Sequence, residues 1–376
     1  MKTSRAPVAL WVDPLSYHLE RDRLWSISSS AGVGEGILGP YVHLRARLSE
    51  LGVPVHTGDM LVTGDAPAAS LNLYVTMGAW RRYRQLARRS DTILSAFFVN
   101  ECPIVEPRLF QELDRASAVF RRLYSFAGDD AMRPFLRAPV HFEPFRYPFP
   151  FSSVDEAAWS RSDRGFLAII NGNKVPRLET NELYSERLRA VAFFEARREI
   201  DVYGVGWDGP PLRIGQTRVP ATLRRIAYLA ERRWDRLRPE RNPLVATARR
   251  AWRGRVASKS ATLSQYTFAI CFENMVMQGW VTEKIFDCLV AGTIPVYLGA
   301  PDVDDWVDPE CFIDMRRFSG YDELRRYLLD LSPAEIAAYR EAGREYFRTE
   351  RFRPFSRDAF AHIFTRILAE DAGIAA

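Results

Sequence analysis

Residues 266–299, YTFAICFENMVMQGWVTEKIFDCLVAGTIPVYLG, decide the fold class of this chain. The runs Tyr266–Phe272 and Ile294–Leu298 are apolar and rich in aromatic and β-branched residues, so both are predicted to be buried parallel strands. Between them we predict a helix that begins close to its N-cap, Thr282, and stops at Gly292. A strand, a helix and a second strand in this order form the repeating unit of a parallel α/β sheet.

The start of the predicted helix suits a diphosphate. The first turn of a helix has N–H groups without helical partners and a partial positive charge, and Lys284 would add a full charge there. The neighbouring carboxylate, Glu283, can accept hydrogen bonds from ribose hydroxyls. A bare Thr-Glu-Lys triplet is an ordinary helix start, but the strands on either side favour a nucleotide-sugar site.

Several motifs in this stretch occur together and in a fixed order. FEN at 272–274, the aromatic Trp280, the TEK helix and the strand AGTIPVYLG resemble the family 10 glycosyltransferases, the α1,3/4-fucosyltransferases, in a bacterial-type soluble form. The resemblance implies that Asn274 and Lys284 contact the phosphates of GDP-fucose and that Glu283 contacts the ribose. It places Trp280 and Thr282 in the donor pocket, with Glu273 as a second-rank candidate. Trp280 replaces the more usual tyrosine, which exchanges a hydroxyl for an indole N–H.

The resemblance also implies an arginine in the first helix of the donor domain. Arg187 matches it, in a helix predicted over 181–197, and its guanidinium could hold two phosphate oxygens at once. Arg177 and Arg189 are the competing choices, and an arginine on such a helix is most often a surface residue. Lys259 is a second-rank donor contact, because the few internal lysines all lie in the donor half of the chain.

A general base is expected from the other domain. Glu101 in FFVNECPIVEP follows the strand predicted over 92–98, at the carboxyl edge where α/β proteins place ligands. The resemblance implies that the family's base follows such a strand in an E-x-x-x-x-x-P context, which runs here from Glu101 to Pro107. Glu106 is the second choice. The ordinary alternative for Glu101 is a loop or N-cap carboxylate before the helix at 107–113.

The fold class expected is α/β, of the GT-B type, with two Rossmann-like parallel-sheet domains facing across a cleft. A chain of 376 residues with 47% apolar content can bury two cores. Strands and helices alternate before and after a Pro- and Phe-rich stretch at 141–153, with a helix predicted over 80–88 before it and a strand predicted over 166–170 after it. We predict an acceptor-binding domain over 1–155, a nucleotide-sugar domain over 163–348, and a tail over 349–376 that packs back on the body.

Targeting and thiol signals are weak in this sequence. The longest apolar run in the first thirty residues, Ala6–Val12, is too short for a signal peptide or a membrane span, so a cytoplasmic location is expected. The four cysteines lie far apart without a C-x-x-C pair, which suggests buried free thiols and neither disulfides nor zinc.

The segment 211–260 holds thirteen Arg and one Lys against three carboxylates. Such a charge excess attracts anionic lipid headgroups, which would place the protein peripherally on the inner membrane, or it attracts nucleic acid. A solvated helical face is the ordinary alternative. Because its aromatic residues have helical spacing and no nucleic-acid motif accompanies them, we expect no nucleic-acid partner.

The function expected from the resemblance is inverting transfer of fucose from GDP-fucose to a hydroxyl of an oligosaccharide or lipid-linked glycan, with α1,3 linkage, in bacterial surface polysaccharide synthesis. Another nucleotide-deoxysugar donor is the alternative, since FEN and TEK contact phosphate and ribose; a non-enzymatic nucleotide binder is a further one. The acidic run Asp302–Asp305 could suggest a metal site, but Lys284 and Arg187 already supply charge, so no obligatory metal or other cofactor is expected.

Overall fold

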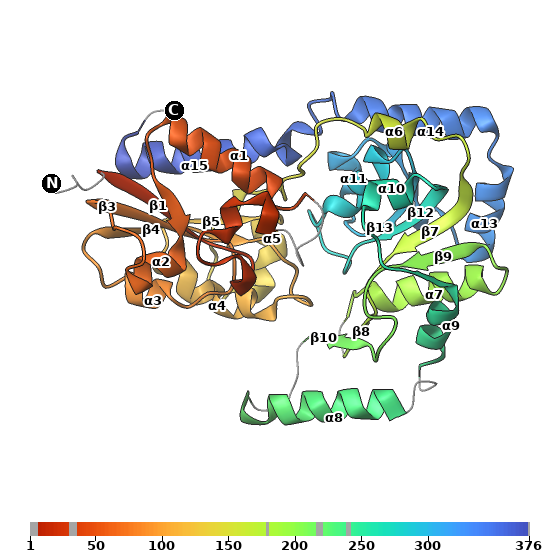
Figure 1. Ribbon diagram of the computed structural model, residues 1–376, viewed down its shortest axis with the longest axis horizontal. Coiled ribbons are helices and arrows are strands. Elements are labelled where there is room, and N and C mark those ends of the chain that lie inside the picture. The colour runs from red at the N-terminus through yellow and green to blue at the C-terminus, as the bar shows by residue number, and fades with distance from the viewer. Residues whose placement is uncertain (1–6, 30–35, 178–179, 216–220, 238–241, 375–376) are drawn as a thin grey trace. The chain divides into compact units, whose positions relative to one another are not determined.

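The computed structural model describes residues 7–29, 36–177, 180–215, 221–237 and 242–374 (Figure 1). The chain divides into two units: unit 1 combines Met1–Ser152 with Phe352–Ala376, and unit 2 is Ser153–Arg351. Each unit has its own six-stranded sheet, in which every strand pair is parallel. Two Rossmann-like parallel-sheet units, the fold class predicted from the sequence, are therefore confirmed.

The sheet of unit 1 has the strand order β2-β1-β3-β4-β5-β6. Its strands are Val8–Asp13 (β1), Val55–Thr57 (β2), Leu71–Thr76 (β3), Thr92–Val99 (β4), Arg122–Ser125 (β5) and Glu143–Pro144 (β6). Both neighbours of β1 pair with it in parallel, so Leu10 lies between Val55 and Leu73. All six residues of β1 are buried, as expected for a central strand covered on both faces.

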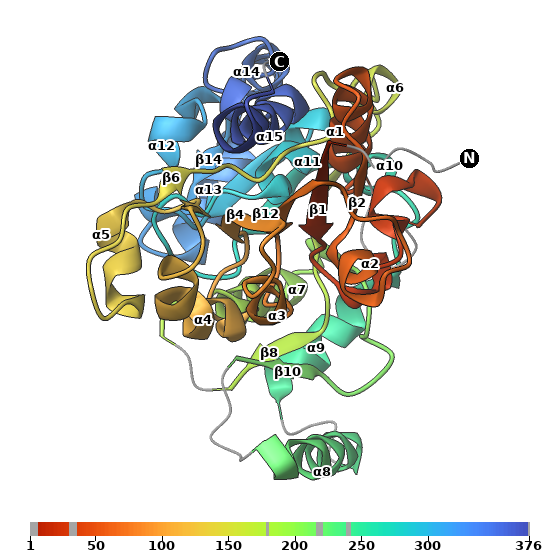
Figure 2. The ribbon, with the colours of Figure 1, turned by 90° about the vertical axis from the view of Figure 1, so that its left-hand side faces the viewer.

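Helices cover both faces of this sheet. One face carries α1 (Gly39–Glu50) and α15 (Arg357–Ala372), and the other carries α2 (Gly58–Thr63), α3 (Tyr83–Leu86) and α4 (Pro107–Ser117) (Figures 1 and 2). A short helix, α5 (Asp129–Met132), follows β5. The core between the sheet and α1 includes Phe360, Phe364 and Leu368 of α15. The predicted tail thus packs on unit 1 and completes its core.

The sheet of unit 2 has the strand order β11-β9-β7-β12-β13-β14. Its strands are Gly165–Ile170 (β7), Ile200–Tyr203 (β9), Trp252–Gly254 (β11), Tyr266–Phe272 (β12), Ile294–Leu298 (β13) and Ile313–Asp314 (β14). Numbered along the chain, this order is 3-2-1-4-5-6, that of a dinucleotide-binding fold, and its direction reverses between β7 and β12. A separate parallel pair joins β8 (Lys174–Pro176) to β10 (Leu212–Ile214).

The helices of unit 2 pack on both faces of its sheet (Figure 1). The core on one face joins β7, β12 and β13 to α7 (Tyr184–Glu195), α9 (Pro243–Ala251) and α13 (Tyr321–Asp330). The other face carries α10 (Lys259–Leu263), α11 (Glu283–Val290) and α14 (Pro333–Tyr346), with the short helices α6 (Glu156–Trp159) and α12 (Val303–Trp306). The remaining helix of this unit, α8 (Arg224–Leu237), lies beside the β8–β10 pair.

Two predicted helices are shorter in the structure than in the sequence-based prediction. The helix predicted from Asn181 begins at Tyr184, because Asn181 has a φ of +61° and Glu182 pairs with Met275 in an antiparallel bridge. The helix predicted over 80–88 shrinks to Tyr83–Leu86. Before it, the Trp80 indole N–H donates to the carbonyl of Pro14, which fixes that residue outside the helix.

No helix in the described parts of the chain is long and apolar enough to cross a membrane. The four cysteines are all buried free thiols.

Candidate functional site

The candidate site lies in unit 2, where the strand order reverses. Asn171 follows the carboxyl end of β7, and Glu273 and Asn274 follow the carboxyl end of β12. Because these strands are adjacent and parallel, their carboxyl ends meet at one edge of the sheet. Doubly wound sheets bind ligands at this kind of position.

Arg187 connects the two strand ends. Its Nη1 donates to Asn171 Oδ1 at 3.0 Å and its Nη2 donates to Asn274 Oδ1 at 3.1 Å. The Phe272 carbonyl accepts from Nε at 3.1 Å and from Nη2 at 2.6 Å. The guanidinium also lies over the Tyr184 ring, 4.5 Å from its centroid. Five donors in a planar fork allow one side chain to reach all these acceptors.

The charge of Arg187 is buried but is not neutralised by a carboxylate. The residue is only 5% exposed, and within the described ranges it forms no ion pair. Burying a lone cation costs free energy unless an anion compensates it, so this position favours an anionic ligand. The two alternatives differ: Arg189 is 59% exposed and pairs with Glu186, while Arg177 pairs with Glu231. Of the three arginines, Arg187 alone contacts the strand ends.

A second cation stands at the start of α11. The Lys284 ammonium donates to Glu273 Oε2 at 2.9 Å and to Thr282 Oγ1 at 2.8 Å. Glu273 is fully buried, and its Oε1 also accepts from the Thr282 backbone N–H at 2.9 Å. The Thr282 hydroxyl bonds to both Glu273 oxygens at 2.9 Å. One buried carboxylate therefore fixes both the first backbone N–H of this turn and the lysine.

Two sequence-based predictions change here. Thr282 occupies the N-cap position of α11, but its side chain caps no backbone N–H of the helix, because its hydroxyl donates to Glu273 and its oxygen accepts from the Lys284 ammonium. Glu273, a second-rank donor contact in the sequence analysis, is buried behind Thr282 and Lys284. Glu273 holds both residues by hydrogen bonds, and of the three side chains Lys284 is the most exposed.

The carboxylates and ammonium groups at the start of α11 and beside it shift one another's pKa values. Burial opposes the charged form of Lys284, but the carboxylates of Glu273 and Glu283 outweigh this effect and raise its pKa. Burial likewise opposes ionisation of Glu283, yet Lys284 and Lys259 lower its pKa to about 2. Both groups are therefore charged at neutral pH, as a cation for phosphate and an acceptor for hydroxyls require.

Lys259 faces α11 from the start of α10. Its ammonium lies 2.5 Å from Asp287 Oδ2 and 3.8 Å from Glu283 Oε1. Burial raises the pKa of Asp287 to about 7, and the charge of Lys259 opposes that rise. The structure thus joins Lys259 to two carboxylates of α11.

Trp280 and its turn are held by contacts from the following strand and loop. Trp280 is 4% exposed, and its carbonyl accepts from the Tyr297 hydroxyl at 3.4 Å. The backbone N–H of Gly279, which has a φ of +71°, donates to Asp302 Oδ1 at 2.8 Å. The acidic run that begins at Asp302 therefore anchors this turn. In the described ranges no three His, Cys, Asp or Glu side chains are grouped so that they could hold a metal ion.

Gly299 at the end of the β13 motif is required for close approach. A Cβ atom at this position would lie 2.5 Å from Glu273 Cγ and 2.5 Å from the Tyr297 hydroxyl. Real Cβ contacts are not this short, so only glycine lets the Glu273 side chain lie where it bonds Thr282 and Lys284.

The predicted base lies in unit 1. Glu101 is two residues past the end of β4 and is half-buried, and its Oε1 accepts from the Cys102 backbone N–H at 2.9 Å. Glu106 occupies the N-cap position of α4 without a side-chain cap hydrogen bond. The capping position that was an alternative for Glu101 therefore belongs to Glu106.

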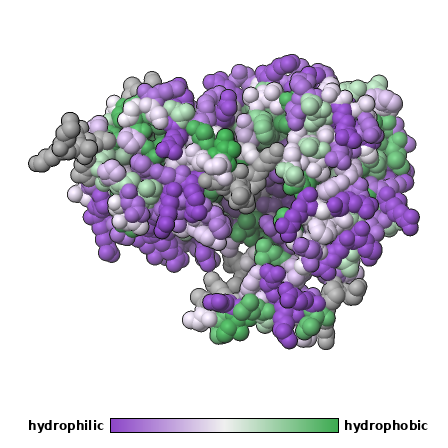
Figure 3. Space-filling model, in the orientation of Figure 1, coloured by the Kyte–Doolittle hydropathy of each residue, from purple (hydrophilic) through white to green (hydrophobic). Residues whose placement is uncertain are grey.

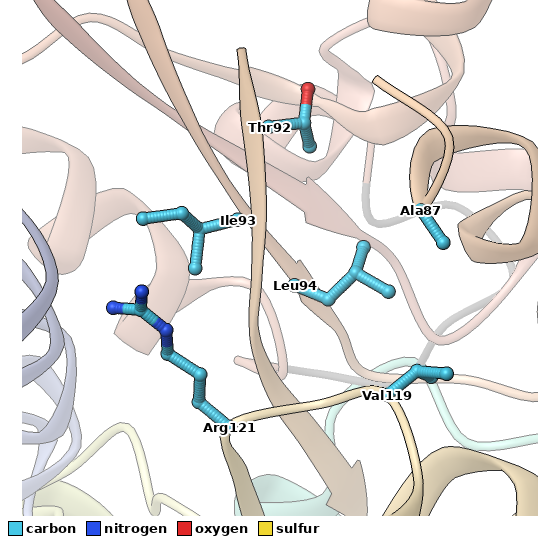
Figure 4. Close-up of a pocket in the computed structure, with 6 residues that line it drawn as sticks. All are labelled: Ala87, Thr92, Ile93, Leu94, Val119 and Arg121. Atoms are coloured by element: carbon cyan, nitrogen blue, oxygen red, sulfur yellow. The ribbon is translucent and has the colours of Figure 1, made fainter. Parts of the chain in front are cut away.

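A hollow of about 350 Å³ lies in the same unit but away from Glu101 (Figure 4). Its lining comes from Thr92, Ile93 and Leu94, with Ala87, Val119 and Arg121. Thr92–Leu94 begin β4, whereas Glu101 follows the opposite end of that strand. None of the predicted site residues lines this hollow.

Comparisons with known proteins match the part of unit 2 that contains β12, α11 and β13. Residues 227–359 match the family model of the glycosyltransferase family 10 (fucosyltransferase) C-terminal domain. This segment of the chain is therefore similar to a family 10 C-terminal domain. Over 73 residues the chain is 42% identical to an α-(1,3)-fucosyltransferase, FucT, of Helicobacter pylori, covering 19% of this chain and 15% of that protein. An α-(1,4)-fucosyltransferase of Arabidopsis thaliana is 37% identical over 75 residues, 20% of this chain and 19% of its own. These matches span less than a fifth of each relative.

Solved structures resemble the whole chain at the level of the fold. The Anabaena protein Alr3699/HepE, solved with UDP and glucose, has a TM-score of 0.52 at 13% identity and covers 96% of this chain and 99% of its own. An α1,3-fucosyltransferase solved with GDP-fucose has a TM-score of 0.48 at 16% identity, covering 100% of this chain and 95% of its own.

The segment that matches the family 10 model contains only part of the candidate site. Asn274, Trp280 and the α11 residues lie inside residues 227–359, whereas Asn171 and Arg187 precede them. Asn171, Tyr184 and Gly299 were not predicted from the sequence as site residues. For Asn171 and Gly299 a signal existed, because each follows the carboxyl end of a predicted strand of this domain.

Proposed function

We propose that this protein is an inverting glycosyltransferase that transfers fucose from GDP-fucose to a hydroxyl of an oligosaccharide or lipid-linked glycan. We further propose an α1,3 linkage and a role in bacterial surface polysaccharide synthesis. The family 10 domain and the fucosyltransferase names of the relatives support fucose as the transferred sugar. The fold likeness to HepE agrees with the two-unit α/β architecture of such enzymes.

One observation carries the proposal: two cationic side chains, those of Arg187 and Lys284, are held by two consecutive residues at the end of β12. Arg187 bonds the carbonyl of Phe272, and Lys284 bonds the carboxylate of Glu273. The charge of Arg187 acts to lower the pKa of Lys284, against the larger effects of Glu273 and Glu283 that raise it. A diphosphate between the two side chains would relieve this repulsion. The same charges would stabilise the diphosphate as it leaves the sugar.

The remaining N–H donor of the Lys284 ammonium fits this role. An ammonium group has three N–H donors, and Glu273 and Thr282 accept two of them. Glu283 Oε1 also lies 4.0 Å from the ammonium nitrogen, beyond hydrogen-bond distance, so the third donor can bind a phosphate oxygen without breaking the bond to Glu273. Glu283, held ionised by Lys284 and Lys259, can then accept from the ribose hydroxyls.

Transfer with inversion also needs a base on the acceptor side of the sugar. We assign this role to Glu101, at the carboxyl edge of the unit 1 sheet, where it would take the proton of the acceptor hydroxyl. Because Lys284 and Arg187 supply the leaving-group charge, we propose that no divalent metal is required.

Calorimetric titration of the purified protein tests this function. GDP-fucose, GDP-mannose, UDP-galactose and dTDP-sugars are titrated separately, each with and without EDTA. Selective binding of GDP-fucose that EDTA leaves unchanged supports the proposal. Selective binding of another nucleotide-sugar would overturn the donor, and loss of GDP-fucose binding in EDTA would overturn the metal-free mechanism.

A further inference from the structure

The helix α8 has one apolar face and one charged face. Ile226, Leu229 and Leu237 recur at helical spacing, so they lie on the same side of the helix. Leu223, in the turn just before α8, continues that side. Glu231 and Asp235 lie four residues apart on the opposite side.

It is the charged face that attaches α8 to unit 2. Asp235, which is 7% exposed, pairs with Arg213 of β10 at 2.8 Å. One turn earlier, Glu231 pairs with Arg177, just after β8, at 2.9 Å. A surface helix of a globular protein normally packs by its apolar face and leaves its charged face in water. In α8 this arrangement is reversed.

The apolar face is exposed as a result. Ile226 is 66% exposed, Leu229 57%, Leu237 66% and Leu223 51%. Figure 3 shows hydrophobic surface over α8 at the lower edge of the molecule. Isolated exposed leucines are common, but four large aliphatic side chains along one helical face, with Arg233 between Leu229 and Leu237, form an exposed apolar stripe, a patch of the kind that marks an interaction surface.

The charges around the patch indicate what covers it. Arg225, Arg232, Arg233 and Arg236 are all exposed, while both acidic residues of α8 are paired with arginines of the body. The outward side of the helix is therefore apolar and positively charged. A second copy of this chain would bring like charges together across the patch. An anionic lipid surface offers both apolar chains and opposite charge.

We infer that α8 is a membrane-docking element that lies in the interface of an anionic lipid bilayer. Ile226, Leu229 and Leu237 enter the headgroup boundary, and the flanking arginines contact anionic headgroups. The helix lies parallel to the surface, because 14 residues are too few to cross a bilayer. This inference does not depend on the proposed sugar donor.

Co-sedimentation with vesicles tests the inference on the full chain. We expect binding to vesicles of phosphatidylcholine with about 30 mol% phosphatidylglycerol and much weaker binding to phosphatidylcholine alone. The triple substitution Ile226→Glu, Leu229→Glu and Leu237→Glu should lower the partition coefficient by about tenfold or more. The matched control is Leu329→Glu, an apolar side chain of α13 that is 50% exposed, and it should bind like the parent protein.

A second variant tests the role of the arginines, and its result does not depend on correct folding of the triple glutamate variant. Arg225→Gln with Arg232→Gln and Arg236→Gln should weaken binding to the anionic vesicles by about fivefold for each arginine removed. Calorimetric titration with GDP-fucose and thermal melting should be unchanged in both variants. Equal binding of parent and variants to anionic vesicles would overturn the inference, as would no binding by the parent. Concentration-dependent dimers without lipid that the triple substitution abolishes would assign the patch to a second copy instead.

Discussion

The ammonium group of Lys284 lies 2.9 Å from the carboxylate of Glu273, which is fully buried behind it. The carboxylate holds the lysine at the start of α11 before any ligand arrives. A charge that is already oriented need not be reorganised when negative charge develops on a leaving group. The ion pair therefore serves both the fold and the proposed chemistry, and substitutions can separate the two roles.

Lys284→Ala should lower kcat/KM for GDP-fucose by about 10² or more, because the leaving diphosphate loses a fixed cation. It should also reduce the free energy of unfolding by about 3 kcal/mol, since Glu273 is left as a buried carboxylate without its partner. Steady-state kinetics and urea denaturation measure the two effects.

The double variant Glu273→Gln with Lys284→Met separates these effects. It removes both charges, so most of the lost stability should return while activity stays low. Recovery of activity together with stability would show that Lys284 acts only as a structural residue.

Arg187→Gln should weaken GDP binding by about tenfold or more, because a buried guanidinium is lost from the strand ends. Arg189→Gln, on the same helix but 59% exposed, is the control and should bind GDP like the parent protein. Calorimetry with GDP measures both. Equal affinities for the two variants would remove Arg187 from the donor site.

Glu101→Gln should slow transfer by about 10² or more, the scale of a lost general base, with GDP binding unchanged. The amide oxygen can still accept from the Cys102 N–H, so the loop should keep its structure. Glu106→Gln is the matched control. If Glu106→Gln slows transfer and Glu101→Gln does not, the base is Glu106.

Gly299→Ala should weaken GDP binding and lower the melting temperature together, because the added methyl group displaces Glu273 and with it Lys284. Gly320→Ala provides the comparison, since no atom lies within 4 Å of a Cβ at that position. Differential scanning calorimetry with and without GDP measures both variants. A Gly299→Ala protein with parental affinity would show that Glu273 can move without cost.

The buried carboxyl of Asp13, at the end of β1, should make the free energy of unfolding depend on pH. This carboxyl is fully buried; burial raises its pKa to about 7, although Arg82 at 3.2 Å opposes the rise. The Asp13 carboxyl ionises near pH 4 in the unfolded chain but only near pH 7 in the folded chain. The free energy of unfolding should therefore fall as the pH rises between these values.

Urea denaturation at pH 5 and pH 8 measures this loss, and Asp13→Asn should reduce it. Asp163→Asn, whose carboxylate is 98% exposed, should leave the loss unchanged. A parent protein that is equally stable at both pH values would contradict the raised pKa of Asp13.

Local patterns in the sequence were sufficient to predict β12, β13 and α11, but not the short edge strands β6, β11 and β14 or the contacts of the site. β12 and β13 have the predicted bounds, because continuous apolar runs specify buried parallel strands. Arg187 was chosen by resemblance, and its burial depends on Asn171 and Phe272, which are distant in sequence. The bond from Thr282 to Glu273 likewise depends on the tertiary fold, so the local rule for N-caps did not predict it.

The packing of α15 on unit 1 has a consequence for the order in which the protein is made. Phe360, Phe364 and Leu368 fill the core between α1 and the first sheet, yet all of Ser153–Arg351 precedes them in the chain. During translation the strands of the first sheet are therefore synthesised before α15, the helix that covers part of one face of that sheet. That apolar face stays uncovered while Ser153–Arg351 are added. The core of unit 1 is completed only when α15 has been synthesised and packs against α1.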